Sequence, residues 1–103
     1  MYRLDIYIPD QHVELVKKAI FDAGAGKFGN YDSCCFQVHG KGQFRALGNA
    51  DPFLGKQDVL EIVDEVQLQC IVQKQYIHEV LAALHTVHPY EEPAYQFWRV
   101  NEF

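Results

Sequence analysis

Several side chains able to bind a ligand lie together near the end of the chain, in His88-Pro89-Tyr90-Glu91-Glu92-Pro93-Ala94-Tyr95, here called the motif segment. An imidazole and two carboxylates are ligand types that suit a borderline or hard divalent metal. His85 precedes His88 by three residues, a spacing that puts both rings on one face of a helix. We therefore treat His88, Glu91, Glu92 and His85 as a candidate metal site, which a neighbouring subunit would help to complete.

The same residues have a structural interpretation. Pro89 and Pro93 restrict the backbone, and Tyr90 and Tyr95 can pack against a sheet while the glutamates cap amides or form ion pairs. At the end of a helix, the helix dipole favours the charged imidazolium form of His88. The sequence leaves open whether the motif segment is a metal site or a stiff connector between a helix and a strand.

Other motifs with chemical meaning are weak. The chain has a single serine, Ser33, and shows no serine–histidine–acid arrangement, so we predict no catalytic residue. Gly24, Gly26 and Gly29 form a G-x-G-x-x-G, but they follow a helix and precede a strand, the reverse of a dinucleotide-binding order. We interpret these glycines as a helix C-cap and a turn, and we predict no cofactor beyond a possible divalent metal.

Composition narrows the classes of protein further. A chain of 103 residues suits one domain, residues 1–103, and a net charge of -5 argues against nucleic-acid binding. No apolar run approaches the roughly 20 residues that cross a bilayer, and Asp5 interrupts the region where a signal peptide is apolar. Three cysteines fit reduced thiols better than a disulfide framework, and we predict a cytoplasmic protein.

Hydrophobic periodicity predicts an alternation of strands and helices. Alternating residues over 2–8 and 94–100 indicate strands, and helical spacing over 11–23 and from Lys74 to Pro89 indicates helices, the first capped by Asp10. A strand over 31–39 is expected to turn at Gly40 and Gly42 into a short strand over 43–47. Residues 59–72 carry a long strand pattern, and the change of phase at Asp64-Glu65 predicts a bend or bulge there, or two strands in series.

This order predicts an α+β fold, a ferredoxin-like βαββαβ plait with an antiparallel sheet and both helices on one face. The opposite face of the sheet then carries partly apolar side chains, which favours a homo-oligomer. Residues 48–55 are expected to form a mobile loop. Phe53 and Leu54 within it either tuck beneath the sheet or contact a neighbouring subunit.

The motif segment closely resembles the hallmark of the Nif-three-like family, the GTP cyclohydrolase I type 2 homologues. The similarity includes Gly24-Ala25-Gly26, Gly29-Asn30-Tyr31, Cys34, Phe36, Gly40-x-Gly42-x-Phe44-Arg45, Asn49, Pro52, Gly55 and the region of Glu61. It covers nearly the whole chain, and it resembles a domain that many bacterial members carry as an insertion and that also occurs as a free-standing small protein. The resemblance implies a PII- and CutA-like fold that assembles as a trimer. The family's dinuclear metal site lies in a flanking domain, so no ligand or catalytic residue carries over.

We therefore expect a small cytoplasmic binding or regulatory module that acts as a homo-oligomer, with a further protein partner possible. A divalent-metal or small-ligand binder of the PII and CutA type is the first alternative. A nucleotide hydrolase-like enzyme is the second.

Overall fold

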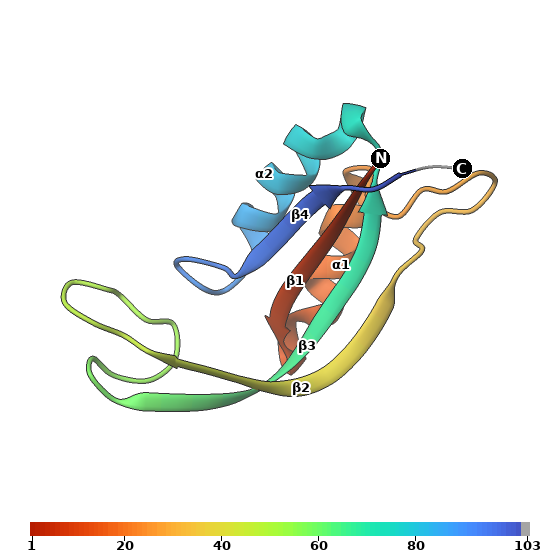
Figure 1. Ribbon diagram of the computed structural model, residues 1–103. Helices are drawn as coiled ribbons and strands as arrows, with labels where there is room; N and C mark the ends of the chain where they lie inside the picture. The colour runs from red at the N-terminus through yellow and green to blue at the C-terminus, as the bar shows by residue number, and fades with distance from the viewer. Residues whose placement is uncertain (102–103) are drawn as a thin grey trace.

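The computed structural model describes residues 1–101, which form one four-stranded sheet covered on one face by two helices (Figure 1). The elements in chain order are β1 (Tyr2–Pro9), η1 (Asp10–His12), α1 (Val13–Asp22), β2 (Phe36–Arg45), β3 (Leu60–Val72), η2 (Lys74–Tyr76), α2 (Ile77–Val87) and β4 (Tyr95–Arg99). The strands lie in the order β2-β3-β1-β4, and every neighbouring pair is antiparallel. The predicted ferredoxin-like plait is confirmed.

The core lies between the sheet and the helices. Alternate residues of β1 and β3 point toward the helices, as the period of two predicts. The fully buried side chains that meet there are Leu4, Ile6, Ile8, Val16, Ile20, Val66, Leu68, Val80 and Leu84. Burying such aliphatic side chains contributes about 1.5–3 kcal/mol each before conformational entropy is subtracted.

The hairpin predicted at Gly40 and Gly42 is wrong. β2 runs unbroken from Phe36 to Arg45 and pairs residue for residue with β3, so that both glycines are extended strand residues. The register of β3 is equally continuous through Asp64-Glu65, so the strand contains no bulge there. The predicted strand start at Tyr31 is also too early, since Tyr31 forms only an isolated bridge with Phe28.

The expected helix cap by Asp10 is not formed. The 3-10 turn Asp10–His12 precedes α1, and no side chain caps either element. The Asp10 carboxylate instead lies 3.8 Å from His39 Nδ1 on β2. The extra turn moves Asp10 away from the first free amides of the helix.

β2 and β3 extend beyond the rest of the sheet as a two-stranded ribbon that curves away from β1 (Figure 1). The Cα radius of gyration is 14.5 Å, compared with about 13 Å for a compact chain of this length. On the ribbon, Leu60 and Ile62 remain 55% and 61% exposed, because the helices do not reach them. In the part of the chain that the structure describes, no helix is long and apolar enough to cross a membrane.

The core assignment predicts that Leu68→Asp abolishes folding, because the aspartate would place an unpaired charge at a position that is 0% exposed. The expected loss exceeds about 4 kcal/mol, which circular dichroism and amide NMR dispersion would detect. Leu15→Asp is the matched control, since Leu15 on α1 is 53% exposed. A Leu68→Asp protein with wild-type spectra would contradict the assignment of β3.

Candidate functional site

His88 holds the start of the motif segment against β1. It follows α2 in an extended conformation, and its amide donates to Leu84 O at 2.9 Å. Its ring turns back toward β1, where Nε2 donates to Tyr7 O at 2.8 Å and Nδ1 accepts from the Tyr90 amide at 3.2 Å. A carbonyl can only accept and an amide can only donate, so the ring is the neutral Nε2–H tautomer.

Burial decides the charge of His88. The residue is 6% exposed, and desolvation lowers its pKa below the ordinary value despite its hydrogen bond to Tyr7 and the negative charge of Glu65. The expectation that the helix dipole favours an imidazolium is therefore wrong. The dipole effect is at most about 2 kcal/mol, and removing a charge from water costs more.

Tyr90 lies at the centre of an aromatic group. Its hydroxyl donates to Glu65 Oε2 at 2.7 Å, and its ring lies 5.9 Å from that of Phe44 and 6.4 Å from that of Phe53. Burial and the Glu65 carboxylate raise the pKa of Tyr90. The Glu65 side chain crosses β2 at Gly42, where a Cβ would overlap the carboxylate. Gly42 is needed for this close approach.

The loop between β2 and β3 packs against the motif segment. The Asp51 amide lies 3.3 and 3.4 Å from the two carboxylate oxygens of Glu91. The Phe53 ring lies edge-on to His12, 5.5 Å away, in addition to its contact with Tyr90. The apolar side chain at the centre of the predicted mobile loop thus contacts two other segments of its own chain.

These contacts surround a cavity of about 430 Å³. Its walls come from β1, β2, β3, the 46–53 loop and the motif segment. The lining residues are Tyr7, Gln43, Phe44, Arg45, Ala46, Leu47, Ala50, Asp51, Pro52, Phe53, Glu65, Tyr90, Glu91, Glu92 and Ala94. This volume lies within the range of about 300–1,000 Å³ that small-molecule sites occupy.

The structure does not bring the four predicted metal ligands together. His85 Nε2 lies 3.0 Å from the hydroxyl of Tyr95 on β4, and both ring nitrogens of His88 are engaged. Glu91 and Glu92 line the cavity. Over residues 1–101, no three His, Cys, Asp or Glu side chains are placed to hold a metal ion. The metal site stays a prediction that would need these histidines to leave their present partners.

The residues predicted to shape the backbone are also located. Gly24 and Gly26 follow α1 with φ of 119° and 76°, and a Cβ on Gly24 would overlap the Tyr76 ring. Gly29 lies in the following turn, and Pro89 and Pro93 lie within the connector between α2 and β4. Sequence reasoning missed Glu65, Gly42 and Asp51. The sequence signal for these contacts is weak: two tyrosines in the motif segment, and a glutamate, Glu65, with no assigned role in a predicted strand.

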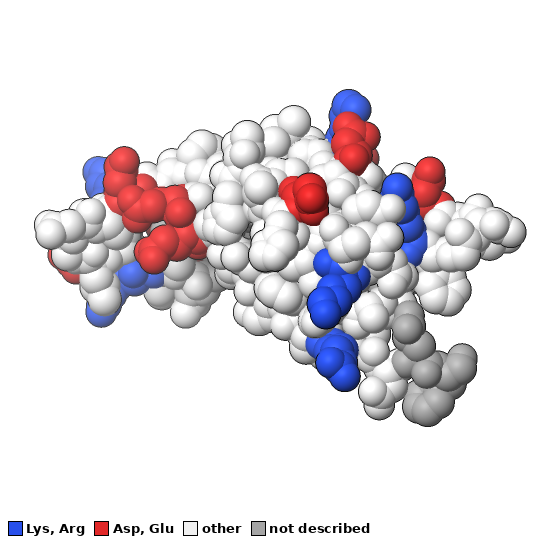
Figure 2. All heavy atoms as spheres, turned by 90° about the horizontal axis from the view of Figure 1, so that it is seen from above, with Lys and Arg blue, Asp and Glu red and all other residues white. Residues whose placement is uncertain are grey.

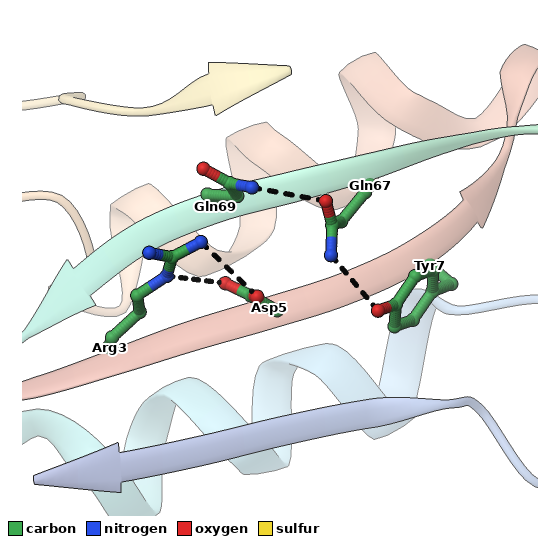
Figure 3. A network of polar contacts seen from close by, with 5 residues as sticks. All are labelled: Arg3, Asp5, Tyr7, Gln67 and Gln69. Atoms are coloured by element: carbon green, nitrogen blue, oxygen red, sulfur yellow. Dashed lines mark hydrogen bonds and ion pairs between the residues drawn. The ribbon is translucent and has the colours of Figure 1, made fainter. Parts of the chain in front are cut away.

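A second polar arrangement covers the open face of the sheet (Figure 3). Arg3 donates to Asp5 at 3.0 Å, and Asp5 is 5% exposed although it faces away from the helices. Beside this ion pair, Gln69 donates to Gln67, which donates to the Tyr7 hydroxyl, both at 3.0 Å. Hydrogen bonds between side chains therefore order this part of the open face.

Comparison with solved structures defines the class of fold. CutA1 from Pyrococcus horikoshii matches with a TM-score of 0.71 at 16% identity, over 100% of this chain and 86% of that chain. A Bacillus cereus protein related to NIF3 matches with a TM-score of 0.80 at 35% identity, over 98% of this chain and 26% of that chain. The fold is the CutA and PII-like form of the ferredoxin-like plait.

Sequence comparison gives the lineage. The chain is 41% identical over 98 residues to the GTP cyclohydrolase 1 type 2 homolog of Halalkalibacterium halodurans, covering 95% of this chain and 26% of that protein. The Bacillus subtilis homolog is 39% identical over 100 residues, covering 97% and 27%. No family model matches the chain. The resemblance to the Nif-three-like family is confirmed: this chain is related to one segment of these proteins and spans about a quarter of their length.

The buried neutral His88 predicts a specific pH dependence of stability. Its pKa in the folded protein lies below the unfolded value of 6.5, so between these two pH values the unfolded chain binds the extra proton. The free energy of unfolding should therefore be fully present above about pH 6.5 and fall as the pH drops through it, by at most about 1.4 kcal/mol per pH unit.

Urea unfolding between pH 7.5 and 5.5, at fixed protein concentration, measures this dependence. His88→Gln should be less stable throughout but show a shallower decline, because its amide does not titrate. His78→Gln, which changes an exposed histidine of α2, should retain the wild-type decline. Identical slopes for wild type and His88→Gln would refute the assignment.

Gly42→Ala should displace the Glu65 carboxylate and remove the acceptor of Tyr90, lowering the free energy of unfolding by about 1–2 kcal/mol. Gly40→Ala is the control on the same strand, since an added Cβ there meets no atom within 4 Å. In a Glu65→Ala background, Gly42→Ala should cost nothing further. An equal loss in both backgrounds would show that Gly42 acts on the backbone and not through Glu65.

Proposed function

We propose that this chain is a cytoplasmic binding module of the Nif-three-like lineage, which holds a small ligand in the cavity beside the motif segment and assembles with copies of itself. The observation that carries the proposal is that the segment with the most unusual composition forms one wall of this cavity. Tyr90, Glu91, Glu92 and Ala94 all line it. A stiff connector alone would not require the 46–53 loop to close over it.

The likeness to CutA supports the fold of such a module and nothing more. A CutA from Archaeoglobus fulgidus is described as a divalent cation tolerance protein, and it is 15% identical to this chain. We carry no metal over from it. All three cysteines are free, which fits a reducing cytoplasm. Desolvation raises the pKa of the Cys70 thiol to about 12, so this thiol is protonated at neutral pH. We do not assign the activity of the full-length relatives to this chain.

Self-assembly is supported by the β2–β3 ribbon. Residues 60–64 pair with β2 and lie beyond the end of β1, and an isolated two-stranded ribbon is at best marginally stable in water. Leu60 and Ile62 project from it without cover by the helices. On the open face, Phe36 and Trp98 are also exposed. We propose that further copies of this chain bury these side chains, with a trimer favoured.

Native mass spectrometry and analytical ultracentrifugation test the assembly. The protein should be a trimer at micromolar concentration, and Ile62→Glu should dissociate it, because a desolvated carboxylate in an interface costs several kcal/mol. Leu15→Glu on the helical face should leave the mass unchanged. A monomeric wild-type protein at tens of micromolar would reject the assembly.

The cavity is tested by amide NMR with a panel of small aromatic amines, alcohols and carboxylates. Shifts should concentrate on residues 46–53 and the motif segment. Ala50→Trp should abolish them by filling the space, whereas Leu15→Trp should not. No shift at millimolar concentration, or shifts confined to other surfaces, would reject the cavity as a binding site.

A further inference from the structure

The charge of the cavity indicates which ligands it can accept. Four carboxylates line it, from Asp51, Glu65, Glu91 and Glu92, against the single guanidinium of Arg45. Acidic side chains gather, with basic side chains beside them, at the end of the molecule that carries the 46–59 loop (left in Figure 2), the end to which this cavity belongs. An anion entering here would lose its hydration beside several like charges.

Two of these carboxylates are free to bind. Glu65 already accepts from Tyr90, and Glu91 accepts from the Asp51 amide. Over residues 1–101, the Glu92 and Asp51 side chains make no hydrogen bond or ion pair, and both residues are exposed. Negative charge without a partner therefore lies at the mouth of the cavity, where a cation could meet it with little rearrangement.

The cavity also has an aromatic wall. The Tyr90 ring lies 5.9 Å from that of Phe44 and 6.4 Å from that of Phe53, and all three residues line the cavity. Aromatic faces attract cations and stack with flat apolar groups. Carboxylates and aromatic rings thus line the same cavity and form a two-part site.

We propose that the cavity binds a small organic cation, an amine or guanidine joined to a flat apolar body. The body packs against Phe44, Tyr90 and Phe53, while the cationic group donates hydrogen bonds to Glu92 and to Asp51 or Glu91. This assignment rests on the proposed ligand-binding function and deepens it. Compact metal ions would leave the aromatic wall unused, and neutral ligands would leave the carboxylates unpaired.

Four small probes distinguish the contribution of the positive charge from that of the aromatic ring. They are phenethylamine, 2-phenylethanol, phenylacetate and ethylamine. Each is titrated into the full chain at pH 7 while amide NMR shifts are followed. Phenethylamine should bind at the 46–53 loop and the motif segment at least tenfold more tightly than any of the other three. Its affinity should fall as salt rises, because the ion pairs at the mouth are partly screened.

Charge-removing variants locate the contact. Glu92→Gln and Asp51→Asn should each weaken phenethylamine binding by about three- to tenfold, in line with an exposed to half-buried ion pair. Glu14→Gln is the matched control, since Glu14 is an exposed glutamate of α1. Unchanged affinity in both cavity variants would overturn the proposed cation contact.

The outcomes separate the two proposals. If 2-phenylethanol or phenylacetate binds the cavity as tightly as phenethylamine, the cation preference is wrong and the cavity is still a binding site. If no probe binds and the wider aromatic panel also fails, the proposed binding function itself is wrong. Phenethylamine binding that persists in Ala50→Trp would place the contact elsewhere and overturn the assignment.

Discussion

The arrangement of the site depends on the buried imidazole of His88. Its two ring nitrogens join the carbonyl of Tyr7 on β1 to the amide of Tyr90 in the motif segment. A neutral ring can make both bonds at once, whereas an imidazolium would put a donor against a donor. This pairing fixes where the connector between α2 and β4 leaves the helix, and hence where Tyr90, Glu91 and Glu92 lie.

The remaining contacts extend this constraint to the neighbouring strands and loop. Tyr90 is held by Glu65, which can cross β2 only because position 42 lacks a Cβ. Glu91 then holds the loop through the Asp51 amide. β2 and β3 form the ribbon and also line the cavity. An assembly that buries the ribbon would therefore also fix the strands that line the cavity.

Periodicity predicted the helices, the strands β1, β3 and β4, and the fold, because the core residues repeat at clear spacing. The turn predicted from the spacing of Gly40 and Gly42 is wrong, because closely spaced glycines occur both in turns and where a side chain crosses a strand. The contacts of Glu65 with Tyr90 and of Asp51 with Glu91 span 25 and 40 residues, and no local rule reports them. The sequence does not predict the neutral form of His88, because the burial of its ring against β1 cannot be read from the helix that precedes it.

The central claim is that His88 is a neutral structural tie, and long-range ¹H–¹⁵N NMR of the histidine rings tests it most directly. We expect a protonated Nε2 and an unprotonated Nδ1 for His88 at pH 7, retained at pH 6.5 and unchanged by added zinc. A doubly protonated ring at pH 6.5 would contradict this claim. A zinc-dependent shift of either ring nitrogen would also contradict it and would support a metal site in the motif segment.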